Sequence, residues 1–196
     1  MSADLYTQAL QRFQELFARA QTLDIPEPAA MSLATADADG RPSVRTVLLK
    51  AVDQRGFVFY TNMRSRKGSQ LLANPHAALC LFWQPLMEQA LVEGAVQPVS
   101  DAEADQYWAT RERMSQIGAW ASQQSQPLPE RAALEKRYDE FEQQFSGQSV
   151  PRPQYWTGFR LQPDLIEFWK SRPGRLHERE RYFSQQGRWQ WQLLYP

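Results

Sequence analysis

The sequence predicts a mainly β protein with added helices, an α+β fold built on an antiparallel sheet or barrel. Strand patterns follow one another directly, separated by turn signals such as Asp37-Ala-Asp-Gly40 and Asp53-Gln-Arg-Gly56, and they do not alternate with helical patterns. Neither a G-x-G-x-x-G nor a G-x-x-x-x-G-K-S/T fingerprint occurs in the 196 residues. This argues against a parallel sheet that binds a dinucleotide or carries a P-loop.

The sequence begins with apolar residues at helical spacing, and strand patterns follow this segment. Leu5, Phe13, Leu16 and Ala20 recur at helical spacing, which predicts a helix that ends near Thr22. Residues 77–83 form a continuous apolar run, which is typical of a buried central strand. We expect strands over 31–36, 43–52, 57–61, 77–83 and 89–99, with a helix over 65–73.

The second half of the chain begins with helices and returns to strands. Ser100-Asp-Ala-Glu103 has the form of a capping box and predicts a helix that runs to about Thr110. We expect further helices near 115–122 and 130–145, then strands over 156–161, 165–169, 180–184 and 189–194. The length favours one domain over 1–196, with an N-terminal helix in 1–25 and C-terminal strands in 156–196.

Charge and composition exclude several classes of protein. The 22 Lys and Arg residues equal the 22 Asp and Glu residues, so the basic excess typical of a nucleic-acid binder is absent. No apolar run approaches the roughly 20 residues of a membrane span, and no signal-peptide pattern is present. Cys80 is the single cysteine, which excludes an internal disulfide, and with only two histidines we expect no metal site. These features predict a cytoplasmic protein.

Basic, hydroxyl and amide side chains recur in short motifs, with no nucleophilic triad among them. Such side chains hold phosphate groups through charge-assisted hydrogen bonds. Their number is enough for two phosphates, which suggests a cofactor and a substrate in one site. The motifs lie at 45–50, 60–61, 65–67, 107–115, 124–125 and 175–179.

One of these motifs lies on a predicted strand, and another lies at the start of a predicted helix. Strict alternation places Arg45 and Lys50 on opposite faces of a strand, so a shared site needs a bulge or twist. Ser65-Arg66-Lys67 opens a helix, where two cations oppose the helix dipole unless a phosphate is bound. The alternatives are charged strand ends in solvent and a solvated turn.

Two other motifs have regular spacing. Tyr107, Arg111 and Ser115 lie four residues apart and share one face if the helix continues through them. Arg175, His177 and Arg179 share one side of a strand by alternation. The alternatives are an exposed polar helix face and a basic strand that faces solvent.

In this order and spacing the motifs resemble the pyridoxine/pyridoxamine 5′-phosphate oxidases, from about Ala30 to Pro196. The resemblance rests most strongly on 45–50, 59–62 with 65–67, 115–120, 124–125, 166–169 and 175–179. It implies an FMN-binding split β-barrel and a homodimer with FMN at the subunit interface. It also implies oxidation of pyridoxamine or pyridoxine 5′-phosphate to pyridoxal 5′-phosphate, with O₂ reduced to H₂O₂.

The resemblance also implies roles for individual residues. The implied FMN contacts are Arg45, Thr46, Val47, Leu48, Leu49, Lys50, Tyr60, Thr61, Arg66, Lys67, Gln89, Gln124, Ser125, Trp169 and Arg179. The implied substrate contacts are Lys50, Tyr107, Arg111 and Ser115 at the phosphate, and Arg175, Leu176 and His177 at the ring. Arg175 and His177 are the implied catalytic residues. No metal is implied.

Three other functions compete with this interpretation. A related flavin oxidase of phenazine biosynthesis would not need residues that bind the phosphate of a substrate. A non-catalytic protein that binds FMN or pyridoxal phosphate would not need Arg175 and His177, and a deazaflavin reductase would lack the motif at 175–179. The chain departs from the family at Glu88, where an arginine is usual, in its short N-terminal arm, and in its last four residues.

Overall fold

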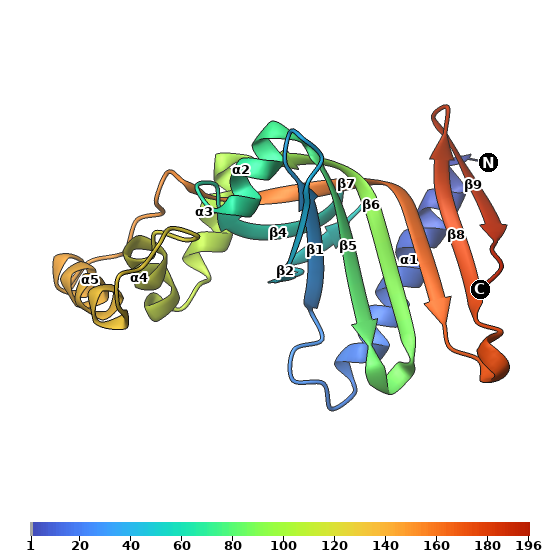
Figure 1. The fold of residues 1–196 in the computed structure, drawn as a ribbon, viewed down its shortest axis with the longest axis horizontal. Helices are drawn as coiled ribbons and strands as arrows, with labels where there is room; N and C mark the ends of the chain where they lie inside the picture. The colour runs from blue at the N-terminus through green and yellow to red at the C-terminus, as the bar shows by residue number, and fades with distance from the viewer. Residues whose placement is uncertain (1) are drawn as a thin grey trace.

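A curled antiparallel sheet of nine strands organises residues 2–196, which the computed structural model describes (Figure 1). The strands are β1 (Ala30–Ala36), β2 (Pro42–Leu48), β3 (Ala51–Asp53), β4 (Gly56–Asn62), β5 (His76–Trp83), β6 (Glu88–Pro98), β7 (Trp156–Lys170), β8 (Glu178–Gln185) and β9 (Arg188–Leu193). The helices are α1 (Ser2–Gln21), α2 (Arg66–Ala73), α3 (Asp101–Ala109), α4 (Arg113–Ala121) and α5 (Arg131–Gln144). The expected α+β class and antiparallel sheet are confirmed.

The long strand β7 divides the sheet into two parts. It pairs with β6 over residues 159–170, while β4 pairs with its residues 156–161 and β8 with its residues 165–170. We expected two strands here, and that prediction was wrong. A bulge between Glu93 and Gly94 keeps the ladder continuous. Any Cβ at Gly94 would overlap the carbonyl oxygen of Gln162, so the close approach of β6 and β7 requires glycine.

The single strand expected over 43–52 is in fact two strands, β2 and β3. The chain changes partner between them, because Leu49 N–H donates to Ala29 while Lys50 N–H donates to Val58. Leu49 itself is buried in the main core. A continuous run of strand-forming residues does not reveal such a change, because the new partner lies elsewhere in the sequence.

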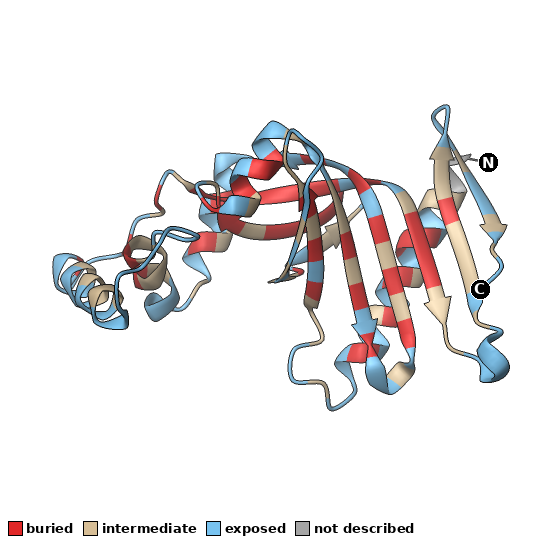
Figure 2. Ribbon diagram, viewed as in Figure 1, coloured by how far each residue is buried: buried red, intermediate tan, exposed pale blue. Residues whose placement is uncertain are grey.

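Helix α1 covers one face of the sheet with its apolar side (Figures 1 and 2). The predicted periodicity is confirmed, since Phe13, Leu16 and Ala20 are all buried. The Phe13 ring meets Phe57 of β4 edge-on, with 4.8 Å between centroids. Burying a side chain of this size contributes about 1.5–3 kcal/mol, so this face of α1 anchors the N-terminus to the barrel.

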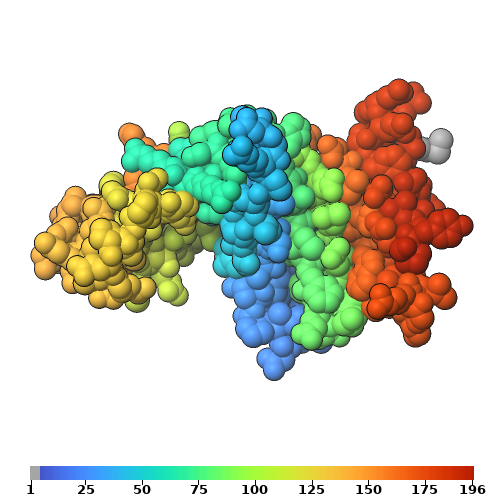
Figure 3. Space-filling model, in the orientation of Figure 1, coloured from blue at the N-terminus to red at the C-terminus, as the bar shows by residue number. Residues whose placement is uncertain are grey.

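Helices α4 and α5, together with Trp108 near the end of α3, form a lobe with a small core of its own. Trp108 and Ile117 are buried there, and Trp108 Nε1 donates to Val150 O at 2.8 Å. Trp156 at the start of β7 joins this core to the sheet. The space-filling view shows a hollow between the lobe and the strands β1 and β2 (Figure 3).

Candidate functional site

A cavity of about 400 Å³ lies where the lobe meets β2 and β4. It gathers twelve of the residues predicted from the sequence as cofactor or substrate contacts. These are Arg45, Thr46, Val47, Leu48, Lys50, Tyr60, Thr61, Lys67, Tyr107, Arg111, Ser115 and Gln124. Polar groups that converge in a cavity of this size are typical of a small-molecule site.

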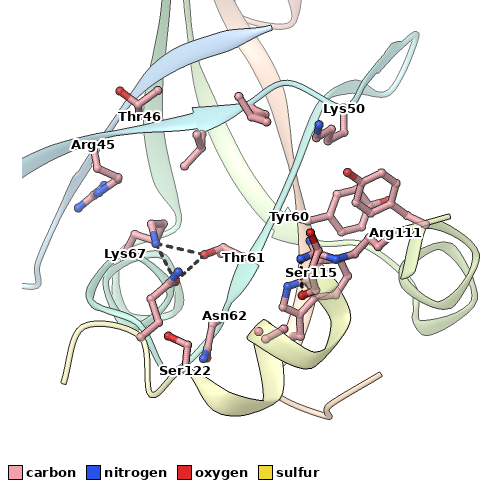
Figure 4. Close-up of a pocket in the computed structure, with 17 residues that line it drawn as sticks. Arg45, Thr46, Lys50, Tyr60, Thr61, Asn62, Lys67, Arg111, Ser115 and Ser122 are labelled. Carbon is pink, nitrogen blue, oxygen red and sulfur yellow. Dashed lines mark hydrogen bonds between the residues drawn. The ribbon is translucent and has the colours of Figure 1, made fainter. Parts of the chain in front are cut away.

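The cationic and hydroxyl groups of the cavity fall into two sets (Figure 4). Arg45, Lys67 and Thr61 lie together on one side, and Lys50 lies with Arg111 and Ser115 on the other. Arg45 and Lys50 reach the same cavity because the chain leaves the strand conformation at Leu48, before alternation can carry Lys50 to the far face.

Buried acceptors hold the Arg45 guanidinium in place. Its Nη1 donates to Thr35 Oγ1 at 2.6 Å, and its Nη2 donates to Ser43 Oγ at 2.5 Å and Gln70 Oε1 at 3.3 Å. Gln70 Oε1 also accepts from both hydroxyls, at 2.6 Å from Thr35 and 2.7 Å from Ser43. Burial and the nearby charge of Arg66 lower the pKa of Arg45 from its ordinary value.

Lys67 turns back from the first turn of α2 toward neighbouring oxygens. Its Nζ donates to Gln124 Oε1 at 2.9 Å, to Thr61 Oγ1 at 3.2 Å and to Ser65 Oγ at 3.4 Å. Burial, helped by the charge of Arg45, lowers the pKa of Lys67 to about 8. The helix N-terminus and two adjacent cations therefore make this side of the cavity suited to an anion.

Arg111 lies against aromatic rings on the other side of the cavity. Its guanidinium carbon is 4.7 Å from the centroid of Trp156, and Tyr60 and Tyr107 stack on each other beside it at 3.9 Å. Nη2 donates to the backbone oxygen of Ser115 at 3.0 Å. Nε is buried and has no hydrogen-bond partner among the described residues.

The expected helix through Tyr107, Arg111 and Ser115 does not continue. Helix α3 ends at Ala109, Arg111 lies in the turn, and Ser115 belongs to α4. The three side chains still line one cavity, because the chain turns between α3 and α4. Spacing in the sequence therefore grouped three residues that do line one cavity, although the local structure expected for them was wrong.

A second group of predicted residues lies away from this cavity, on β6, β7, β8 and the turn between β7 and β8 (Figure 1). Gln89 and Arg179 are the ladder neighbours of Trp169 on either side. The ring of His177 is 4.7 Å from the ring of Trp169. This group comprises Gln89, Trp169, Arg175, Leu176, His177 and Arg179, none of which lines the cavity.

The expected alternation of Arg175, His177 and Arg179 along a strand was wrong. Arg175 ends the 3-10 turn η2 (Pro173–Arg175), and β8 begins only at Glu178. Arg175 has φ +61°, a left-handed conformation that no strand residue adopts. Arg179 is on the strand, where its Nε donates to the buried carboxylate of Glu167 at 2.8 Å.

Three predicted contacts lie outside both groups. Leu49 is buried in the main core. Arg66 is exposed on α2 and does not line the cavity, but its charge lies near Arg45. Ser125 lies in the loop after α4 with φ +73° and does not line the cavity, although its neighbour Gln124 does.

Comparison with known proteins decides the family. Residues 18–145 match the family model described as pyridoxamine 5′-phosphate oxidase, and residues 156–196 match the one described as pyridoxine 5′-phosphate oxidase C-terminal dimerisation region. The chain belongs to the pyridoxamine 5′-phosphate oxidase family.

Relatives in this family cover nearly the whole chain. A pyridoxine/pyridoxamine 5′-phosphate oxidase of Myxococcus xanthus (strain DK1622) is 57% identical over 187 residues, which are 95% of this chain and 91% of that protein. The protein of the same name from Alkalilimnicola ehrlichii is 54% identical over 194 residues, which are 98% of this chain and 99% of that one.

Solved structures show the same fold. PhzG from Burkholderia lata 383, in complex with tetrahydrophenazine-1-carboxylic acid, has a TM-score of 0.90 at 34% identity and covers 95% of this chain and 91% of its own. An FMN-binding protein of Nostoc punctiforme, related to pyridoxamine 5′-phosphate oxidase, has a TM-score of 0.75 at 18% identity, with 95% and 96% covered. The expected split-barrel fold is confirmed.

Several residues that line or support the cavity were not predicted from the sequence. Asn62, Ser122 and Trp156 line the cavity, and Gln70 supports Arg45 from behind. Asn62 directly follows the Tyr60-Thr61 motif, which was a usable signal. Gln70 gave no such signal, because only the fold places α2 beside β1 and β2.

The negative charge of Glu88, at a position where the family usually has an arginine, is neutralised by cations of the same chain. Its buried carboxylate pairs with Lys170 at 2.9 Å across the β6–β7 ladder and with Arg19 of α1 at 3.2 Å. Two cations therefore compensate the negative charge next to Gln89.

Among residues 2–196, no helix is long and apolar enough to cross a membrane, and no group of three or more His, Cys, Asp or Glu side chains is arranged to hold a metal ion.

Proposed function

We propose that the chain is an FMN-dependent oxidase that converts pyridoxamine 5′-phosphate and pyridoxine 5′-phosphate to pyridoxal 5′-phosphate, with O₂ reduced to H₂O₂. The observation that carries the proposal is the pair of cationic sets in one cavity, since each set suits one phosphate. Relatives that carry this activity in their names are 50–57% identical to the chain.

The first set fits the terminal phosphate of FMN. Arg45 and Lys67 supply the positive charge, Thr61 supplies a hydroxyl, and the N-terminus of α2 adds its dipole. A single phosphate needs no dinucleotide fingerprint, which is consistent with its absence. When bound, FMN supplies the redox chemistry, accepting a hydride from the substrate and passing electrons to O₂.

The second set fits the phosphate of the substrate. Lys50 and Arg111 supply charge, and Tyr107 and Ser115 supply hydroxyls. The positive charges of Lys50 and Arg111 on the same side of the cavity favour a bound anion. These four residues anchor the substrate by its phosphate and so fix the position of its ring in the cavity.

We infer that a second copy of the chain completes the site. Gln89, Trp169, Arg175, His177 and Arg179 lie away from the cavity, and all but Gln89 fall inside the segment 156–196 that matches a dimerisation region. In a homodimer, this group from one protomer would meet the cavity of the other, with FMN between them. Arg175 and His177 would then orient the substrate ring, and the guanidinium would favour the transition state electrostatically.

The test is to purify the protein, record its absorbance spectrum and oligomeric state, release the cofactor by heat, and identify it by chromatography. We expect a yellow dimer that carries FMN and forms pyridoxal phosphate and peroxide from both substrates. FAD, a nicotinamide, or no cofactor after reconstitution with FMN would refute the assignment.

An oxidase of phenazine biosynthesis is the second candidate, because PhzG shares the fold at 34% identity. The four-residue set around Arg111 favours the phosphorylated substrates over a phenazine precursor, which has no phosphate. Assaying tetrahydrophenazine-1-carboxylic acid beside pyridoxamine phosphate separates the two. Faster turnover of the phenazine compound would favour the second candidate.

Arg175→Ala should lower the rate of flavin reduction about tenfold while FMN stays bound, because the guanidinium positions the ring and does not hold the cofactor. Anaerobic stopped-flow at saturating substrate isolates this step from reoxidation by O₂. An unchanged rate would make Arg175 a surface cation, and loss of FMN would place it in the cofactor site.

The affinity of the apoprotein for FMN should fall as the pH rises above about 8, by up to about tenfold per pH unit, because a phosphate dianion binds the protonated form of Lys67, whose pKa is about 8. The stability of the apoprotein should change in the opposite direction. Between pH 8 and the ordinary pKa of 10.5, the unfolded chain binds more protons at this lysine, so stability rises with pH.

FMN titrations followed by fluorescence at pH 7, 8 and 9 measure the first effect. Lys67→Arg is the matched control, since a guanidinium stays protonated throughout and should remove the pH dependence. The same decline in Lys67→Arg would show that another group titrates.

A further inference from the structure

An ion pair closes the turn that carries Arg175 and His177. Arg172 donates from Nε to Glu178 Oε1 at 2.8 Å and from Nη2 to Glu178 Oε2 at 2.9 Å. This two-point contact joins the residues just before and just after the turn, in the geometry that best matches a guanidinium to a carboxylate. The two residues are called the Arg172–Glu178 clasp below.

The turn inside the clasp adopts a conformation that needs support. Gly174 has φ +66° and Arg175 has φ +61°, so two consecutive residues are left-handed. Glycine adopts this conformation freely, but the Cβ of Arg175 makes it unfavourable. Such a conformation persists where the surrounding structure constrains it, and the clasp constrains both ends of this turn.

The same residue also fixes the proton of His177. The backbone N–H of Arg172 donates to His177 Nδ1 at 3.2 Å. A ring nitrogen that accepts a hydrogen bond carries no proton, so the neutral imidazole holds its proton on Nε2. The Trp169 ring lies against the imidazole, with centroids 4.7 Å apart, and limits its rotation. His177 therefore presents Nε2–H as a donor.

We propose that Arg172 is a positioning residue, which closes the turn through Glu178 and holds His177 as the Nε2–H tautomer, so that His177 donates to an acceptor atom on the ligand. The proposal rests on the proposed function, in which His177 lies against the substrate ring.

The test begins with the tautomer, read by NMR of the FMN-reconstituted protein labelled with ¹⁵N-histidine. The chain has two histidines, so His76→Asn leaves a single imidazole and assigns the signals. We expect His177 Nδ1 to give a pyridine-type shift and Nε2 a pyrrole-type shift when the ring is neutral. The opposite pattern would overturn the proposal.

Substitution of the clasp supplies the second arm. Arg172→Ala keeps the backbone N–H but removes the clasp that holds this N–H against Nδ1, so it should give His177 signals averaged between the two tautomers. It should also lower kcat/KM for pyridoxamine phosphate about tenfold, since small misplacements of orienting groups are costly in rate. The charge-swapped double variant Arg172→Glu with Glu178→Arg should restore both. Arg131→Ala, which removes an exposed arginine paired with Glu135 on α5, should change neither.

Each remaining outcome decides one question. An unchanged tautomer in Arg172→Ala, or a changed tautomer with unchanged kcat/KM, overturns the positioning role. If the native chain forms no pyridoxal phosphate, the proposed function fails, while the tautomer and its response to Arg172→Ala still report on the clasp.

Discussion

The Arg111→Ala variant should bind phosphorylated substrate about ten- to more than a hundredfold more weakly than the native chain, with little change in FMN affinity. Removing one hydrogen bond to a charged group costs about 1.5–3 kcal/mol. Arg111 stands out because its Nε is a buried donor without a partner among the described residues, while Nη2 is occupied by Ser115 O. The ring of Trp156 holds the guanidinium in place, so the site is organised before the ligand arrives.

The measurement compares pyridoxamine phosphate with pyridoxamine, which has no phosphate. The native chain should prefer the phosphorylated compound strongly, and Arg111→Ala should lose most of that preference. Lys136→Ala, an exposed cation on α5, is the control for net charge and should behave like the native chain. Equal weakening of FMN and substrate, or no weakening, would contradict the assignment of two separate phosphate sites.

Glu167→Ala should lower the free energy of unfolding by about 3 kcal/mol, which corresponds to a fall of about 6–12 °C in Tm for a chain of this size. The carboxylate is buried, accepting from Arg179 at 2.7 and 2.8 Å and from Arg181 at 3.0 and 3.1 Å. Its removal leaves two arginines close together with no counter-charge. The expected loss lies at the lower end of the range for buried pairs because both arginines keep contact with solvent.

Thermal unfolding at a fixed protomer concentration measures this effect, since dimer formation makes Tm depend on concentration. Glu135→Ala is the matched control, because it breaks an exposed pair one helical turn apart on α5 and should cost no more than about 0.5 kcal/mol. Glu167→Gln keeps the shape and removes the charge, so it should fall between the two. A Glu167→Ala variant as stable as Glu135→Ala would show that the arginines do not need the carboxylate.

Local patterns in the sequence were sufficient for the elements that depend on neighbouring residues. The period of Phe13, Leu16 and Ala20 gave the buried face of α1. Ser100 caps α3 as its motif predicted, accepting from Glu103 N–H. Helix α2 begins where it was predicted, and Ser65 caps it by accepting from Gly68 N–H. Residues within one turn of each other decide these features, so the sequence by itself determined them, together with the α+β class.

Contacts between distant parts of the chain were decided only by the tertiary structure. The division of 43–52 into β2 and β3, and the union of 156–170 into β7, depend on which strands lie alongside. The acceptors of Arg45, the counter-charges of Glu88 and the left-handed turn at Arg175 likewise depend on groups brought together by the fold. A strand in a sheet and a buried charge each need a partner from elsewhere in the chain. Local propensity carries no information about a partner tens of residues away, so these features could not be predicted from the sequence.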